Sequence, residues 1–194
     1  MLTKKEDILS ASLTVFQEEG LKGARMERIA QVAGVSKRTL YKHFESKDAL
    51  FEAICAMVIE ILSSMEIADY DPDAAIDVQL EEALRSYIRQ TMTPEFLNCS
   101  RVILAEFMRN PTAASEFYDA YRSIDAPLAR LVSSAMTAGK LRSSEPVAAT
   151  NLLLSLFKNV IQVPTILNLT RAPTQSEIDT VVEKSVRVFV SEYG

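Results

Sequence analysis

Apolar residues recur every three or four positions along most of the chain, which is the spacing of one face of an α-helix. In residues 4–19 the positions Ile8, Leu9, Leu13 and Phe16 follow this spacing, and the charged residues lie off the stripe. No stretch shows the apolar and polar alternation of a half-buried strand. Only 5 Gly and 7 Pro occur in 194 residues, which disfavours a turn-rich β fold. The pattern predicts an all-α protein.

Glycine, serine and proline mark where the predicted helices begin and end. A helix over 4–19 stops at Gly20 to Gly23, where one glycine serves as a left-handed cap. A short helix from about Arg25 to Val32 ends at Gly34, and Ser36 is placed to cap a third helix over Lys37 to Phe44. Ser46 caps a long helix that runs through Leu62. Further helices are predicted at about 75–92, 95–109, 113–138, 145–163 and 174–192.

Charge is distributed unevenly along the chain. The formal net charge is −5. Residues 1–50 contain nine Lys and Arg against seven Asp and Glu, a net of +2, whereas residues 51–194 contain twelve against nineteen, a net of −7. The acidic overall composition therefore does not explain why basic residues cluster near the third helix.

A helix, a tight turn through Gly34 and a second helix opened by Ser36 form the outline of a helix-turn-helix, whose second helix lies in the DNA major groove. Lys37 and Arg38, near the start of that helix, are placed to bond to guanine. Groups at the edges of the footprint could bind phosphates. These are Arg25, Thr39, Tyr41, Lys42, His43 and Lys47. For each of these residues, the alternative to DNA contact is that the side chain simply lies on an ordinary solvated helix face.

The stretch GARMERIAQVAGVSKRTLYKHFESKDALFEAI resembles the DNA-binding region of the TetR family of bacterial transcription regulators. The resemblance covers about the first quarter of the chain and implies a three-helix DNA-binding domain over residues 1–47. It implies a larger helical domain for effector binding and dimerisation over residues 48–194. It also places Lys37, Arg38 and Tyr41 near bases, with Arg38 at a position that varies in the family and so helps to determine the operator.

The same resemblance implies two uses for the apolar side chains of the second part, most of which must simply be core. One is a small-molecule pocket, with candidate residues Met92, Phe96, Phe107, Phe117, Tyr121, Phe157 and Ile161. The other is a homodimer interface made by the last two long helices, whose apolar content is difficult to bury in a monomer. Its candidate residues are Leu152, Leu153, Leu156, Val160, Val182, Val186 and Phe189.

These features predict a sequence-specific regulator, by default a repressor, that binds a palindromic DNA operator as a homodimer and is released by an apolar or amphipathic effector. The alternative is a DNA-binding regulator without a small-molecule effector, controlled by a protein partner or by its abundance. An enzyme is disfavoured, because no catalytic motif accompanies the single histidine, His43. Cys55 and Cys99 form no C-x-x-C pair, so no metal or cofactor is expected. With neither a secretory signal nor a membrane span expected, we predict a cytoplasmic protein.

Overall fold

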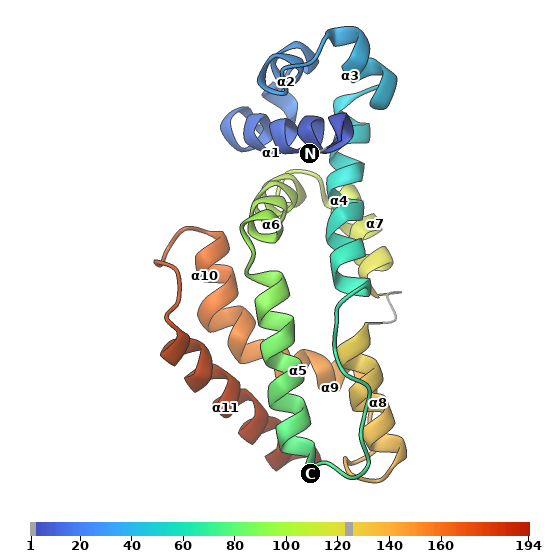
Figure 1. The fold of residues 1–194 in the computed structure, drawn as a ribbon, viewed down its shortest axis with the longest axis vertical. Helices are drawn as coiled ribbons and strands as arrows, with labels where there is room; N and C mark the ends of the chain where they lie inside the picture. Colours follow the sequence, from blue (N-terminus) through green and yellow to red (C-terminus); the bar gives the residue numbers. More distant parts are fainter. Residues whose placement is uncertain (1–2, 123–125) are drawn as a thin grey trace. The chain divides into compact units, whose positions relative to one another are not determined.

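The computed structural model describes residues 3–122 and 126–194, and the regular structure within them is entirely helical (Figure 1). The all-α prediction is therefore confirmed. No helix of the described residues combines the length and the apolar character needed to cross a membrane. The elements in chain order are α1 (Lys4–Gly23), α2 (Met26–Val32), α3 (Lys37–His43), α4 (Lys47–Ser63), α5 (Ile76–Thr91), α6 (Pro94–Phe107), α7 (Pro111–Arg122), α8 (Pro127–Thr137), α9 (Pro146–Phe157), the π-helical turn η1 (Lys158–Gln162), α10 (Val163–Ile166) and α11 (Gln175–Tyr193).

The helices form two compact packing units. The first unit contains residues 3–60 and 98–122, and the second contains residues 61–97 and 126–194. This division rests on packing. The domain boundary expected after residue 47 instead separates the residues expected to bind DNA from those expected to bind the effector and the partner. Two helices, α4 and α6, contribute residues to both units.

The core of the first unit joins the three N-terminal helices to the start of α4. Its fully buried side chains include Ile8, Ile29, Leu40, Leu50 and Ile54. Both α1 and α2 contribute to this core, and α2 packs against α1 and α3. The apolar stripe predicted for residues 4–19 therefore faces the core.

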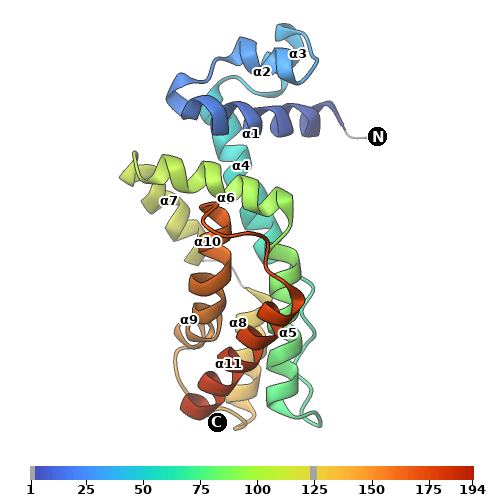
Figure 2. The same ribbon diagram turned by 90° about the vertical axis from the view of Figure 1, so that its left-hand side faces the viewer.

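In the second unit α11 packs against α9 and α5, and α8 packs against α9 (Figure 2). Phe157 and Phe189 are fully buried there, and the ring of Tyr87 meets that of Phe157 edge-on at a centroid distance of 6.1 Å. A salt bridge between Arg85 and Asp179 joins α5 to α11. The contacts among α5, α8, α9 and α11 form the core of the second unit.

Two glycines stop helices as the sequence predicts. Gly20 has φ 69° and interrupts the regular part of α1, after which a short helical turn continues to Gly23. Gly34 has φ 65° and follows α2. Positive φ strains residues that carry a Cβ, so glycine is favoured at both positions.

The helix predicted over residues 113–138 is wrong, because α7 and α8 are separate helices. Pro127 is the first residue of α8. Proline disfavours the helical conformation in the residue before it, and Ala126 is extended at φ −70°, ψ 129°. Residues 123–125, which the predicted helix also includes, lie outside the described residues.

Helical structure also continues past Pro164, where the sequence predicted a loop. The turn η1 precedes this proline, and its wider ring is closed by the N–H of Val163 donating to the carbonyl of Lys158. Proline inside a helix clashes with the carbonyl four residues earlier, and a π turn relieves this crowding. The helix then ends at Asn168, which has φ 55°, while the Leu169 N–H donates to the Pro164 carbonyl over 2.9 Å.

We expect Gly34→Ala to lower the free energy of unfolding by about 1 kcal/mol, because an L-residue is strained at positive φ. A Cβ at this position would meet no atom within 4 Å, so the loss reports backbone strain alone. Gly23→Ala is the control, since its Cβ would make an ordinary contact with Glu19 Cβ at 3.6 Å. Urea unfolding followed by circular dichroism should show an unchanged or higher stability for the control. Equal effects of the two variants would contradict this account of Gly34.

Candidate DNA-binding surface

The turn between α2 and α3 is closed by local hydrogen bonds. The N–H of Val35 donates to the Ala30 carbonyl over 3.0 Å, which folds the chain back across Gly34. Ser36 then caps α3, because its Oγ accepts from the N–H of Thr39 at 3.0 Å. The hydroxyls of Ser36 and Thr39 lie 2.8 Å apart. The predicted Ser36 cap is confirmed, and it holds the first turn of α3 in place.

Burial decides which face of α3 points outward. Leu40 is fully buried and Phe44, the residue after the helix, is nearly so. The outward face therefore carries the polar and basic side chains. Of the eight candidates for DNA contact, six are exposed and two, Thr39 and Lys47, are half-buried. The six exposed residues are Arg25, Lys37, Arg38, Tyr41, Lys42 and His43.

Tyr41 does not belong to the core. Its exposed fraction is 48%, so half of an aromatic side chain faces solvent from a short helix. Such a side chain offers an apolar ring and a hydroxyl that can both donate and accept. That combination suits the edge of a polar nucleic-acid surface, and the same exposure also fits the alternative of an ordinary solvated helix face.

The basic residues of α3 differ in what they bind within the protein. Lys37 Nζ donates to Glu27 Oε1 of α2 at 3.0 Å. The hydrogen bond from Lys37 lowers the pKa of Glu27. Among the described residues, Arg38 and Lys42 have no such partner. Both therefore keep all their donors available, whereas one of the three donors of the Lys37 ammonium is bound to Glu27.

Glu27 was not singled out from the sequence. It lies ten residues before Lys37, and only the packing of α2 against α3 brings the two together. A carboxylate on a nucleic-acid-binding face repels phosphates unless a cation neutralises it. The Glu27 to Lys37 pair therefore reduces the net charge of α3 and leaves Arg38 and Lys42 as its unneutralised cations.

Lys47 has a structural contact of its own. Its Nζ donates to the Lys22 carbonyl at 2.8 Å and lies 3.5 Å from the Ala24 carbonyl. These carbonyls lie at the C-terminal end of α1, where helix oxygens lack intrahelical partners and a cation is favourable. Lys47 thus ties the start of α4 to the end of α1. A contact with a phosphate would be made by the remaining donor of the same ammonium.

The candidate effector-binding residues fall in both packing units. In the first unit the ring of Phe107 lies 5.2 Å from that of Phe117 and 6.4 Å from that of Phe51, and Tyr121 is half-buried. In the second unit Phe157 is fully buried, Phe96 and Ile161 are nearly so, and Met92 is half-buried. The Phe51, Phe107 and Phe117 rings form an aromatic cluster, whereas Phe157 packs within the core of the second unit.

The candidate dimer residues divide by burial. Leu153, Val182, Val186 and Phe189 are buried inside the second unit, and Leu156 is half-buried. Leu152 and Val160 are exposed, at 37% and 57%. Periodicity alone could not separate a helix face covered by the same chain from one left open. The buried four stabilise the protomer, so only the exposed pair and Leu156 could reach a partner directly.

We expect Lys47→Met to lower the free energy of unfolding by about 1 kcal/mol, because the Lys22 carbonyl loses its charged donor. Lys42→Met is the matched control on the exposed face of α3, and it should change stability little. Thermal unfolding of the two variants without DNA makes the comparison. If the two melt at the same temperature, the contact of Lys47 with α1 contributes nothing to stability.

Known proteins share both the sequence and the fold of this chain. Residues 8–54 match the bacterial regulatory proteins of the tetR family, and residues 78–194 match the AefR-like transcriptional repressor C-terminal domain. The HTH-type transcriptional regulator RutR of Escherichia coli O157:H7 is 32% identical over 149 residues. That match covers 74% of this chain and 66% of RutR, so the chain spans slightly under two thirds of that relative's length.

Solved structures agree along almost the whole chain. A TetR family transcriptional regulator from Pseudomonas syringae pv. tomato str. DC3000 has a TM-score of 0.87 at 28% identity, covering 99% of this chain and 98% of its own. The flavonoid-responsive regulator FrrA has a TM-score of 0.73 at 27% identity, covering 98% and 96%. The two matched domains, the helical fold and the capped α3 lead to one conclusion: this chain belongs to the TetR family of DNA-binding transcriptional regulators.

Proposed function

We propose that this protein represses transcription by binding a palindromic operator as a homodimer, and that a small effector releases it. The observation that carries the DNA-binding part is the outward face of α3, where Arg38, Tyr41 and Lys42 are exposed beside a helix start fixed by Ser36. In this proposal residues 1–47 read DNA and residues 48–194 bind the effector and the partner. The protein would act in the cytoplasm, where its operator lies.

Base and phosphate contacts are divided by position on α3. A guanidinium near the start of a recognition helix can form paired hydrogen bonds to guanine O6 and N7. Lys37 and Arg38 occupy the first two positions of α3, and we also assign a base contact to Tyr41, one turn further along the helix. We assign phosphate contacts to the residues at the edges of this face. They are Arg25, Thr39, Tyr41, Lys42, His43 and Lys47.

A dimer explains how so small a reading surface gains affinity and specificity. A twofold pair places two recognition helices about one DNA turn, roughly 34–36 Å, apart. The exposed aliphatic side chains of α9, of η1 and of residues 163–167 support a partner-binding face on these segments. They are Val147, Leu152, Val160, Val163 and Leu167, and Val188 of α11 is also exposed. Because such side chains are unfavourable in water, a second copy that covers them stabilises the pair.

Release by an effector is supported by two features. FrrA, a structural relative at 27% identity, is named as flavonoid-responsive. The Phe51, Phe107 and Phe117 rings form an aromatic cluster of a kind that suits an apolar or amphipathic compound, with Phe107 centred 6.4 Å from Phe51 and 5.2 Å from Phe117. A coupling free energy of about 1–3 kcal/mol would change operator affinity by several-fold to a hundredfold.

The first experiment selects bound sequences from a random duplex library and titrates the best one at several salt concentrations. We expect a palindromic site that binds at least about a thousandfold more tightly than random DNA. Binding that is weak and depends only on salt would contradict base reading by α3.

Arg38→Ala should weaken binding to the selected operator by about 1–3 kcal/mol and relax the preference at one base pair of each half-site. Lys42→Ala should weaken operator and random DNA alike, because a phosphate contact carries no sequence information. Fluorescence anisotropy with operator and scrambled duplexes measures both variants. Equal losses on the two duplexes for Arg38→Ala would remove its base-reading role.

Leu152→Glu should shift the protein from dimer to monomer, because a carboxylate is costly to bury in an apolar interface. Val78→Glu on α5 is the control, since Val78 has an exposed fraction of 59% and lies outside the proposed face. Sedimentation velocity of both variants reports the assembly state. A Leu152→Glu protein that remains dimeric would move the interface elsewhere.

A further inference from the structure

The start of α11 borders a hollow of about 500 Å³, whose wall includes one of the candidate effector-binding residues, Ile161. Its walls are η1 with α10, the segment 167–174, and the first three turns of α11, all within the second packing unit. Small-molecule sites commonly have volumes of about 300–1,000 Å³. The hollow is therefore large enough for a metabolite-sized ligand.

One rim of the hollow is held in place by an ion pair. Both terminal nitrogens of Arg171 donate to the carboxylate of Glu177, each over 2.9 Å. Glu177 also accepts from the backbone N–H of Thr174, which caps α11 in return. The bond from Arg171 and the bonds from Thr174 lower the pKa of Glu177 to about 2. Arg171, Thr174 and Glu177 thus hold this rim by hydrogen bonds within the protein.

The inner wall is apolar. Ile161 and Val181 are buried along it, and Val160 is exposed at the edge with 57% of its surface in solvent. Val160 and Ile161 belong to the π-helical turn, an irregularity that frequently occurs at functional sites. This wall would favour a ligand with an aliphatic or aromatic body over a fully polar one.

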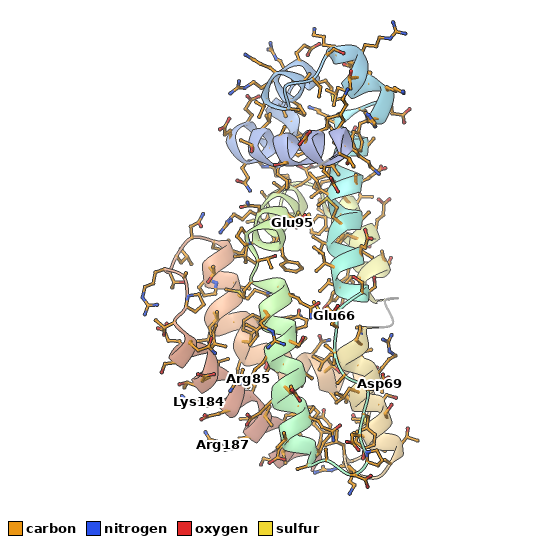
Figure 3. The ribbon with its side chains drawn as sticks, viewed as in Figure 1. Glu66, Asp69, Arg85, Glu95, Lys184 and Arg187 are labelled. Atoms are coloured by element: carbon orange, nitrogen blue, oxygen red, sulfur yellow. The ribbon has the colours of Figure 1, made fainter. Side chains whose placement is uncertain are left out.

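A cation with no protein partner completes the hollow. Lys184 is exposed and, among the described residues, has no ion pair or hydrogen bond. In Figure 3 it lies on the outer side of α11, near Arg187 and away from the labelled acidic residues Glu66 and Asp69. Arg171 and Glu177 neutralise one another, so the lining carries one excess positive charge.

We propose that this hollow binds an amphipathic organic anion. Its carboxylate or comparable acidic group pairs with Lys184, and its apolar body lies against Ile161, Val181 and Val160. A cationic ligand would meet the excess positive charge, and a ligand without a charged group would leave Lys184 without a partner. The site is separate from the Phe51, Phe107 and Phe117 rings, which lie in the other packing unit.

The proposal can be tested without DNA. Three probes share one apolar body: octanoate, octanol and octylammonium. Each is titrated into the full-length, ¹⁵N-labelled protein, and amide shifts are followed by NMR. We expect octanoate to bind most tightly and to shift the amides of Ile161, Thr180 and Val181. Tighter binding of octylammonium, or octanoate shifts confined to other residues, would overturn the proposal.

Lys184→Gln should weaken octanoate binding about fivefold, the upper range for an exposed ion pair, and leave octanol binding unchanged. Lys140→Gln is the matched control, because Lys140 is an exposed lysine of the same unit outside the hollow. Thr180→Phe, which places a ring in the hollow, should abolish binding of octanoate and octanol alike. Equal octanoate affinity in Lys184→Gln and Lys140→Gln would overturn the proposal.

A second copy of the chain is the competing occupant, since Val160 also belongs to the proposed dimer face. If dimerisation fills the hollow, octanoate will bind only to the monomeric Leu152→Glu variant, and a small-molecule site in the working protein is excluded. Operator affinity is measured separately on the same samples. If octanoate does not bind while operator binding is intact, the proposed anion site is overturned and the proposed DNA-binding function is not affected.

Discussion

The fixed direction of α3 is the constraint on which the DNA-binding surface depends. Three local features set it: positive φ at Gly34, the Ser36 cap and burial of Leu40. Each satisfies a different need, namely a reversal of the chain, a partner for an orphan amide and removal of apolar surface from water. Because α3 has only seven residues, it would not be stable as an isolated helix. Its outward side chains therefore owe their positions to the packing behind them.

Contacts that are local in sequence could be predicted, and those that depend on packing could not. The Ser36 cap and the glycine stops follow from residues three or fewer positions apart, so the sequence predicts them well. The bond from Lys47 to the Lys22 carbonyl spans 25 residues, and the pair of Lys37 with Glu27 spans ten. Both were missed, because basic residues near a predicted DNA surface suggest phosphate binding and not partners inside the protein.

The errors in the C-terminal part have different physical causes. The break before Pro127 was readable, since proline constrains the residue that precedes it. The buried positions of Leu153 and Phe189 were not, because an apolar stripe shows that a face is covered and not by which chain. Continuation through Pro164 needed a π turn, for which sequence periodicity has no clear signal.

The connections between the two packing units limit how a signal could reach DNA. The chain passes from one unit to the other inside α4, again inside α6, and a third time between α7 and α8. A helix transmits displacement along its axis better than a loop, because its backbone bonds are satisfied internally. Under the proposed function the effector lies against Phe51 of α4 and Phe107 of α6, in the same unit as α3. Caps and burial hold α3 within that unit. Effector binding would therefore act through the positions of α4 and α6, changing the spacing of two recognition helices and leaving the side chains on each α3 unchanged.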